Sequence, residues 1–515
     1  MREAKDTFYV TTPIYYPNDV PHIGHAYNAV AVDCIARFHR LRGERVFHLT
    51  GTDEHGLKLQ RAAEAAGMEP QRWVDEMEPR WREVWARLDI AYDDYIRTTE
   101  PRHEHAVVKL LEAVHDNGRD DIYLGHYEGL YCVACEAYYT EADLLPGGLC
   151  PIHHRPVERM REENYFFRLS AYADRLLEHY ERTPSAVEPE VRRNEVLSLI
   201  RGGLQDFSIS RTSFSWGVPL PWDPKHVCYV WFDALTNYIT AAGYADDPER
   251  FARTWPCDVH VIGKDILRFH AIYWPAMLMA GGVEPPTQVW AHGFLTVGGQ
   301  KMSKTNATGI HPFELLDHFG VDSYRYYFLR EIQFGQDGNF SWESMVERHN
   351  ADLANGLGNL ASRVLAMVGS YFDGAVPSPG PREAASDLPE VAADVAARFQ
   401  DLMGQVAPAQ ALSAAWDLVA RANQYLVERE PWQLAKDPTR REELAGVLYA
   451  AAETLRILAV LVSAAMPAAA ERLWTQLGMT SPLDAARLPA AAAWGGLQQG
   501  TATKRGEALF PRLDG

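Results

Sequence analysis

The sequence has few cysteines, no long apolar run and no pattern typical of an export signal. Its 515 residues include only six cysteines, too few for a disulfide scaffold. A membrane span needs roughly 18–20 apolar residues. The longest candidate, residues 457–470, is shorter and contains Pro467, so we predict a buried helix. The N-terminus lacks the charged-then-apolar pattern of a secretion signal. We therefore expect a cytoplasmic protein without a membrane partner.

Positive charge is also scarce. The formal net charge is −19, from 69 acidic and 50 basic residues, which argues against a protein that coats nucleic acid electrostatically. A specific RNA partner held by a local basic face is compatible with this balance. Hydrophobic residues make up 47% of the chain, enough for several cores, because single cores stop growing near ~250–300 residues.

The order of predicted elements indicates a split α/β domain followed by a helical one. Residues 8–12 and 46–50 are predicted strands around a helix over 24–41, which is typical of a parallel βαβ unit. Short apolar strands are predicted again at 228–232, 259–262 and 289–291, while residues 120–224 form short, turn-rich pieces. From about residue 341 the pattern is almost entirely helical, for example over 442–463.

The segment His22-Ile23-Gly24-His25 opens the first predicted helix. Two histidines three apart share one face of a helix. The helix N-terminus adds unpaired N–H groups and partial positive charge, and glycine allows a ligand to approach the backbone closely. This predicts a polyphosphate cradle, the alternative being two ordinary surface histidines.

A second cationic segment, Lys301-Met302-Ser303-Lys304-Thr305, follows Gly298-Gly299. A glycine hinge with two lysines forms a loop that can close on phosphates. Taken alone, the segment is more typical of a solvated surface loop.

Three cysteines and a histidine have metal-ligand spacing. Cys132-x2-Cys135 and, after fourteen residues, Cys150-x2-His153 predict one tetrahedral Zn²⁺ site in which all four positions are filled. A filled site is structural rather than catalytic. His154 is an alternative fourth ligand, and free thiols in a reducing compartment are the alternative to metal.

The His22–His25 and Lys301–Thr305 segments together are the two signatures of class I aminoacyl-tRNA synthetases. The chain resembles the methionyl-tRNA synthetases of the bacterial one-zinc type, nearly end to end, with Thr305 where the family usually has Ser. The resemblance implies activation of L-methionine by ATP to methionyl-adenylate. It also implies transfer to the 3′ end of tRNA(Met), including the initiator tRNA, with release of AMP and pyrophosphate. Mg²⁺ would accompany ATP, and one structural Zn²⁺ would be bound per chain.

The resemblance also implies site residues. Those assigned to catalysis are His22, His25, Lys301 and Lys304. Those assigned to ATP are Tyr16, His22, Gly24, His25, Gly263, Asp265, His292 and Lys304. Those assigned to methionine are Ile14, Tyr16, Asp53, Trp231, Ala234, Leu235, Tyr238, Ile266 and His270. Those assigned to the anticodon are Asn359, Arg363 and Trp432, and the zinc ligands are Cys132, Cys135, Cys150 and His153.

The chemistry of these residues suits the assignments. Methionine needs apolar walls and one anion for its ammonium group, and Asp53 directly follows a predicted strand, where parallel sheets bind ligands. A tryptophan face stacks a splayed RNA base, while Asn and Arg read base edges. Without the resemblance, the aromatic stripe around Trp231 would be predicted as core, Asp53 as a helix cap and Trp432 as a buried side chain.

The implied architecture is a Rossmann-type α/β catalytic domain over 1–119 and 225–295, split by a zinc-knuckle insertion over 120–224. A loop and stem-contact region over 296–349 and an all-α anticodon-binding domain with a tail over 350–515 follow. We expect a monomer, because the sequence shows no C-terminal dimerisation module. The alternatives are another class I synthetase for an apolar amino acid, a short nucleotidyltransferase, or a zinc-knuckle RNA-binding protein.

Overall fold

The computed structural model describes residues 5–133, 137–139, 141–152, 154–297, 300–301, 310–380 and 386–513. The chain divides into two compact units. The first comprises Met1–Pro21, Phe47–Ala86 and Tyr92–His292, and the second comprises His22–Val46, Arg87–Ala91 and Gly293–Gly515. Each unit is built from segments far apart in the sequence, so the units do not follow the expected domain boundaries.

The first unit is organised around a sheet with strand order β3-β2-β1-β12-β13-β7. The pairs β1–β12, β12–β13, β13–β7 and β2–β3 are parallel. The strands are β1 (Thr7–Thr11), β2 (Arg45–Thr52), β3 (Asp94–Arg97), β7 (Val187–Glu188), β12 (Val259–Gly263) and β13 (Val289–His292). The predicted strands at 8–12, 46–50, 259–262 and 289–291 are confirmed.

The strand order reverses direction between β1 and β12. From β1 the chain proceeds outward through β2 to β3, whereas β12 and β13 extend the sheet the other way. Open parallel sheets bind ligands in the crevice beyond the carboxyl ends of the strands at such a reversal. The segments after β1, β2, β12 and β13 are therefore where a site is expected.

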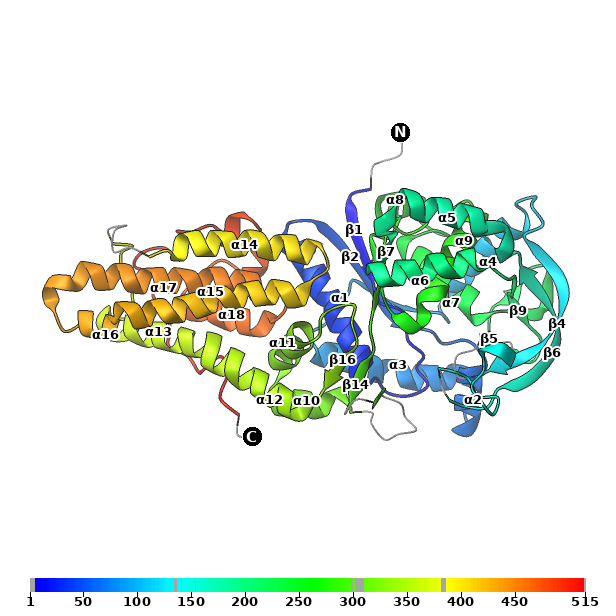
Figure 1. Ribbon diagram of the computed structural model, residues 1–515, viewed down its shortest axis with the longest axis horizontal. Helices are drawn as coiled ribbons and strands as arrows, with labels where there is room; N and C mark the ends of the chain where they lie inside the picture. Colours follow the sequence, from blue (N-terminus) through cyan, green and yellow to red (C-terminus); the bar gives the residue numbers. More distant parts are fainter. Residues whose placement is uncertain are drawn as a thin grey trace. The chain divides into compact units, whose positions relative to one another are not determined.

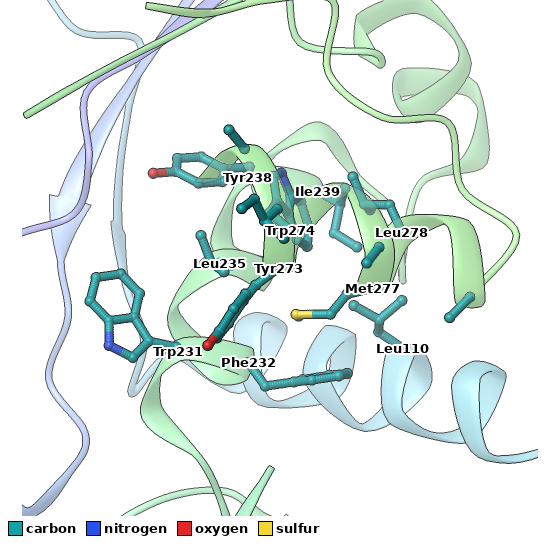
Figure 2. Packing of buried hydrophobic residues seen from close by; sticks show 14 of the residues in the cluster. Leu110, Trp231, Phe232, Leu235, Tyr238, Ile239, Tyr273, Trp274, Met277 and Leu278 are labelled. Carbon is teal, nitrogen blue, oxygen red and sulfur yellow. The ribbon is translucent and has the colours of Figure 1, made fainter. Parts of the chain in front are cut away.

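Helices pack on this sheet around one hydrophobic core. Residues of α4, α7 and α9 interdigitate there, with Trp231, Leu235 and Tyr238 along one side of α7 and Phe232 and Ile239 toward the other helices (Figure 2). The helices of the unit are α2 (Leu57–Ala65), α3 (Pro70–Arg87), α4 (Pro101–His115), α5 (Ala173–Arg182), α6 (Glu190–Arg201), α7 (Val230–Ala242), α8 (Pro248–Thr254) and α9 (Trp274–Ala280).

The predicted strand at 228–232 is wrong. Strand β11 (Asp223–Cys228) ends there and pairs antiparallel with β9 (Ser210–Arg211) and β10 (Pro219–Leu220), while α7 begins at Val230. Every residue of α7 is buried. A short apolar run cannot distinguish a strand from a buried helix by periodicity alone, which explains the error.

The expected insertion over 120–224 is not one separate piece. A long antiparallel hairpin, β4 (Ile122–Cys132) with β6 (Glu158–Phe167), is flanked by β5 (Ala137–Tyr139) and β8 (Phe207–Ser208). Residues 184–201 instead return to the main sheet, where β7 forms its edge beside β13. The part of the insertion with its own sheet is therefore confined to β4–β6 and β8.

The second unit is mainly helical (Figure 1). It contains α1 (Ile23–Leu41), α10 (Pro312–Phe319), α11 (Val321–Glu331), α12 (Trp342–Arg348), η7 (His349–Gly358), α13 (Asn359–Tyr371), α14 (Leu388–Gly404), α15 (Pro408–Arg429), α16 (Pro431–Leu434), α17 (Arg441–Val462) and α18 (Pro467–Gln476). A small sheet of β15 (Gln300–Lys301), β14 (Leu295–Val297) and β16 (Gly338–Phe340) accompanies them. The helices expected at 24–41 and 442–463 are confirmed.

Helix α17 lies in the middle of the bundle. The segment Pro438–Val462 is long and apolar enough to cross a membrane by length and composition, but its apolar window is wholly buried inside the protein. The helix expected over 457–470 is two helices, because α17 ends at Val462 and Pro467 begins α18. Proline is favoured in the first turn of a helix, where its missing N–H costs nothing.

A buried arginine ties α1 to the helical bundle. Arg325 on α11 donates to Asp33 of α1 at 2.6 Å and to the carbonyls of Ala464 and Ala465, which follow α17. It also donates to the carbonyls of Leu88 and Asp89. These five hydrogen bonds use every N–H of a guanidinium that is fully buried.

Candidate active site

In the first unit, the predicted site residues gather beyond the carboxyl ends of the central strands. Ile14 and Tyr16 follow β1, Asp53 follows β2, Asp265 follows β12, and His292 ends β13. These are the strands on either side of the reversal in strand order. The position matches the crevice in which open parallel sheets bind ligands.

The predicted methionine residues form one apolar group. Trp231, Leu235 and Tyr238 belong to the core cluster around α7, and Ile14, Tyr16 and Ile266 pack against it. Trp231 stacks on Phe269 at a centroid distance of 3.8 Å. Spacings of four and three residues place these α7 side chains on one helical face, visible along one side of α7 in Figure 2. The structure thus brings together the apolar wall that methionine requires.

Tyr238 and His270 form a buried polar pair within this wall. The Nδ1 of His270 lies 3.1 Å from the carbonyl of Ile266, and its Nε2 lies 2.8 Å from the Tyr238 hydroxyl. A carbonyl only accepts, so Nδ1 carries the hydrogen and Nε2 accepts from Tyr238. Burial lowers the pKa of His270 to about 4, so the ring is neutral at physiological pH.

Asp53 occupies a fixed position next to the end of β1. Its backbone N–H donates to the carbonyl of Tyr15 at 2.8 Å, and its side chain is buried. The ring of Tyr15 stacks on Trp81, at 5.2 Å between centroids, so the neighbours Ile14 and Tyr16 extend from the other side of the backbone. Burial raises the pKa of Tyr238 well above its usual value, and the charge of Asp53 contributes to the rise.

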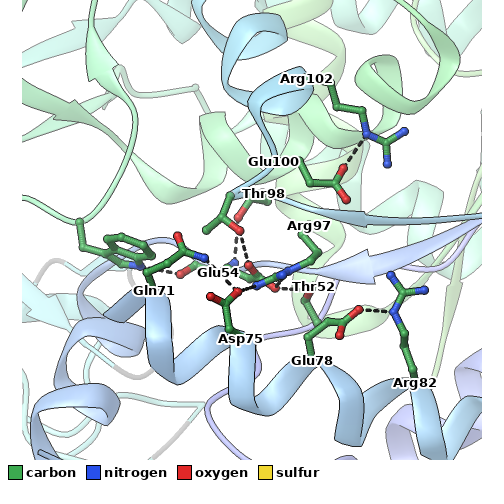
Figure 3. Close-up of polar contacts among 12 residues, drawn as sticks. Thr52, Glu54, Gln71, Asp75, Glu78, Arg82, Arg97, Thr98, Glu100 and Arg102 are labelled. Carbon is green, nitrogen blue, oxygen red and sulfur yellow. Dashed lines mark hydrogen bonds and ion pairs between the residues drawn. The ribbon is translucent and has the colours of Figure 1, made fainter. Parts of the chain in front are cut away.

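The residue after Asp53 anchors the same loop. Glu54 accepts from Thr52 at 2.7 Å, from Arg97 at 2.8 Å and from Thr99 at 2.5 Å, while its N–H donates to Thr98 (Figure 3). A buried carboxylate with this many donors is held in one position. The loop that carries Asp53 is therefore rigidly attached to the strands β2 and β3.

Sequence reasoning did not identify a second buried carboxylate near this loop. Asp233 of α7 is fully buried between His55, at 2.7 Å from its Oδ2, and His103, at 2.7 Å from its Oδ1. The only signal in the sequence was an acid within an apolar stretch, which suggests a polar partner but not its identity.

On the expected adenosine side, Gly263 and His292 are direct partners in the parallel pair β12–β13. A Cβ added to Gly263 would lie 2.6 Å from Oδ1 of Asp265 and 3.9 Å from Cε1 of His292. The backbone of Gly263 is extended, with φ −71° and ψ 146°, so glycine is required by the closeness of Asp265 rather than by conformation. The structure brings these residues together.

In the second unit, His22 and His25 cap α1. The Nδ1 of His22 accepts from the N–H of Gly24 at 3.1 Å, and the Nδ1 of His25 accepts from the N–H of His22 at 3.3 Å. The two rings stack with centroids 3.7 Å apart. Because both Nδ1 atoms accept, each neutral ring carries its hydrogen on Nε2, where it can donate to a phosphate oxygen.

The expectation of unpaired N–H groups at this helix end is wrong. The amides of Gly24, His25 and Ala26 have acceptors on His22, and that of Ile23 donates to the carbonyl of Ile310. The His22 imidazole accepts from Gly24, and backbone carbonyls accept from the other three amides. Anion binding at this helix end would depend on the imidazole Nε2–H groups and on the helix dipole.

Within the second unit, the described backbone that follows the lysine segment contacts the histidine segment. The hydrogen bond from Ile23 to Ile310 is 3.3 Å long and joins the first turn of α1 to the backbone that follows the lysine segment. Lys301 ends the hairpin strand β15, whose backbone pairs with β14. Lys304 lies outside the described residues. Among the described residues, Ile310 is the one that joins the chain after the lysine segment to the histidine segment.

The predicted zinc ligands are only partly described. Cys132, at the end of β4, is the cross-strand partner of Ala137 on β5, and the thiol of Cys150 lies 3.6 Å from the hydroxyl of Tyr139 on the same strand. Both cysteines are buried. Cys135 and His153 lie outside the described residues, and within the described ones no group of three potential metal ligands is found. The two described cysteines therefore meet at one short strand.

The predicted anticodon residues lie on neighbouring helices of the second unit. Asn359 and Arg363 are one turn apart on α13, and the guanidinium of Arg363 lies 5.7 Å from the centroid of the Trp432 ring on α16. Trp432 is half-buried and Asn359 is exposed. The arrangement presents an aromatic face beside two hydrogen-bonding side chains.

A parallel sheet with a reversal point, a helix capped by the histidines of the first signature, and the lysine signature in the sequence together indicate a class I aminoacyl-tRNA synthetase. Comparison with known proteins agrees. Residues 8–159 and 149–365 match the family model described as tRNA synthetases class I (M), and residues 376–515 match the anticodon binding domain of methionyl tRNA ligase. The chain belongs to the methionyl-tRNA synthetase family.

Individual relatives are similar over nearly the whole length of this chain. The methionine–tRNA ligase of Streptomyces coelicolor is 51% identical, covering 100% of this chain and 98% of the relative. That of Bacillus subtilis is 46% identical, covering 100% of this chain and 79% of the relative. A Mycobacterium tuberculosis methionyl-tRNA synthetase solved with methionyl-adenylate is 45% identical, with a TM-score of 0.94 over 98% of this chain and 100% of that one. The apo form of that enzyme gives a TM-score of 0.88.

Proposed function

We propose that this protein activates L-methionine with ATP and transfers the methionyl group to tRNA(Met), including the initiator tRNA. The observation that carries the proposal is the apolar group around α7, which lies with Asp53 at the strand ends beside the reversal point. The full-length similarity to methionine–tRNA ligases and the neighbour solved with methionyl-adenylate support it. Another class I synthetase for an apolar amino acid is the runner-up.

The chemistry needs positioning and charge rather than a protein nucleophile. The methionine carboxylate attacks the α-phosphorus of ATP, the bond to the β-phosphate oxygen breaks, and pyrophosphate leaves. Asp53 would hold the ammonium group, and Trp231, Leu235 and Tyr238 the thioether side chain. Ala234, Ile266 and His270 would complete this wall. Fixing two reactants in this way makes a bimolecular step effectively unimolecular.

Phosphate charge would be stabilised by the two signature segments. His22 and His25 would donate from Nε2, as their capping geometry requires, and Lys301 and Lys304 would neutralise the departing pyrophosphate. Mg²⁺ would enter bound to the ATP phosphates, as this ion usually does. Asp265 would accept the ribose hydroxyls, with Gly263, Gly24, Tyr16 and His292 shaping the nucleotide site.

We propose one structural Zn²⁺ held by Cys132, Cys135, Cys150 and His153. The burial of both described cysteines beside the short strand β5 fits this donor set. Such a metal supplies folding energy to a segment with a small core of its own. Asn359, Arg363 and Trp432 would read the anticodon. We further propose that the enzyme is cytoplasmic and monomeric. Sedimentation at the mass of a single chain tests the monomeric state.

The decisive experiment is ATP–pyrophosphate exchange with each amino acid in turn. Methionine should give the highest kcat/KM, and a higher value with leucine, isoleucine, valine or cysteine would establish the runner-up. Asp53→Ala should reduce methionine-dependent exchange about 10- to 100-fold, the order of loss when a charge-assisted contact of about 1.5–3 kcal/mol disappears. The matched control is Asp401→Ala, at an exposed position of α14. Normal exchange by the Asp53 variant would contradict the pocket assignment.

A further inference from the structure

We propose that Asp233 is a positioning residue for methionine activation. It fastens the loop that carries Asp53 to the helix that carries the apolar wall of the amino-acid pocket. The inference deepens the proposed function and rests on it, because it assumes that Asp53 and α7 bind methionine.

The geometry places Asp233 between both halves of that pocket. Its Oδ2 lies 2.7 Å from the Nδ1 of His55, and His55 is two residues after Asp53 in the same loop. Asp233 itself lies on α7 between Trp231 and Ala234, two residues assigned to the wall. The loop and the helix are 178 residues apart in sequence, and this contact joins them directly.

A third element completes the cluster. The Oδ1 of Asp233 lies 2.7 Å from Nε2 of His103 on α4, and the Nδ1 of His103 lies 3.2 Å from the hydroxyl of Thr240, two turns further along α7. His55 also packs edge-on against Trp216, at 5.4 Å between centroids. Both carboxylate oxygens of Asp233 are thus engaged, so the side chain cannot rotate without breaking a contact to the loop or to α4.

The charges around the cluster favour an ion pair. Burial would lower the pKa of His55, but the charge and hydrogen bond of Asp233 raise it above its usual value, with smaller contributions from Glu104 and Glu54. Burial would raise the pKa of Asp233, yet the charge of His55 and hydrogen bonds from both rings hold it at about 2. Behind Asp233, burial raises the pKa of the Cys228 thiol, which therefore stays neutral.

These shifts define the pH range in which Asp233 and His55 are both charged. Asp233 is ionised above its depressed pKa, and His55 is protonated up to its raised pKa. The contribution of the pair is therefore complete at mildly acidic pH, above the usual pKa of an aspartate and below the usual pKa of a histidine. It is lost as the pH rises through the pKa of His55. The affinity for methionine should weaken over that alkaline limb, while the affinity for ATP should not.

The test is Asp233→Asn in the full-length protein, measured by ATP–pyrophosphate exchange. Asparagine has the size of aspartate, but its NH₂ group cannot accept a hydrogen bond. One of the two histidines therefore loses its acceptor, and the loop with Asp53 should shift. We expect the KM for methionine to rise about 10- to 100-fold, because a misplacement of about 1 Å can cost a factor near 100. The KM for ATP should stay within twofold. The alkaline limb of kcat/KM for methionine should move to lower pH, because His55 loses its partner.

Asp121→Asn is the matched control. Asp121 is also a buried carboxylate of the first unit, and it accepts from Tyr172 and Asn117, neither of which is assigned to the pocket. It should leave both KM values and the pH profile unchanged. If Asp233→Asn does not fold, His55→Gln replaces it: the methionine KM should rise in the same way, and the alkaline limb assigned to His55 should disappear, because glutamine keeps one donor but does not titrate. Equal rises in both KM values, or an unmoved methionine KM and pH limb in a folded variant, would overturn the proposal. Wild-type exchange with methionine tests the function itself, so the two failures are distinguishable.

Discussion

Replacing Gly263 by alanine should weaken ATP binding without unfolding the protein. The added Cβ would lie 2.6 Å from Oδ1 of Asp265, a separation that real Cβ atoms do not show, so the carboxylate must retreat by about 0.4–0.8 Å. The backbone at Gly263 is extended, so alanine brings no conformational strain. Asp265 is exposed and can move at little cost in stability.

The size of the effect follows from the contact that is lost. A hydrogen bond to a charged group contributes about 1.5–3 kcal/mol, so displacing Asp265 from the ribose hydroxyls should raise the KM for ATP about 10- to 100-fold. The KM for methionine should change by less than twofold. The free energy of unfolding should change by less than about 0.5 kcal/mol, as for other surface changes.

Pyrophosphate exchange at varied ATP concentration, together with urea unfolding, measures both quantities. Gly369→Ala on α13 is the matched control, because its Cβ would meet nothing within 4 Å. That variant should keep normal kinetics and gain up to about 1 kcal/mol of helix stability. Unchanged ATP kinetics in Gly263→Ala, with a folded protein, would show that Asp265 does not hold the ribose.

Three further outcomes are expected. Trp432→Ala should reduce tRNA charging by about 10-fold or more, since base stacking contributes roughly 1–3 kcal/mol, while sparing adenylate formation; equal loss of both steps would make Trp432 purely structural. Glu453→Gln should cost about 3–5 kcal/mol of unfolding free energy, because Glu453 is buried and accepts from Arg456 and from three backbone N–H groups at 495–497. The control is Glu442→Gln at an exposed position of the same helix, and an equally small loss in both variants would contradict this role of Glu453. Elemental analysis should find one zinc per chain, and Cys132→Ser should abolish it; a metal-free wild type would contradict the knuckle.

The elements predicted correctly were those with an unambiguous pattern. The strand, helix and strand at 8–50 and the strands at 259–262 and 289–291 are bounded by turns and have the right lengths. The strand expected at 228–232 failed because five apolar residues fit a buried helix equally well. Strand β7 is two residues long and is defined by its pairing with β13, so no local sequence pattern predicts it.

The site was predictable only where a motif carries it. The histidine and lysine segments and the loop with Asp53 were found by spacing and by position after a strand. The contacts of Asp233 were not predicted, because its partners His55 and His103 are 178 and 130 residues away in the sequence. The capping of α1 by its own imidazoles also escaped prediction, since a histidine in this role depends on ring orientation.

Arg325 has a consequence for anyone who wishes to exchange parts of this protein. Its guanidinium donates to five acceptors from three separate stretches of chain, and a lysine would bring only three N–H groups to the same place. A chimera that contains the helical bundle of a relative must therefore place the carbonyls equivalent to those of Ala464 and Ala465 where Arg325 can donate to them and to Asp33 at the same time. A graft that ignores this junction would leave a buried cation without its acceptors in the unit that also contains His22 and His25.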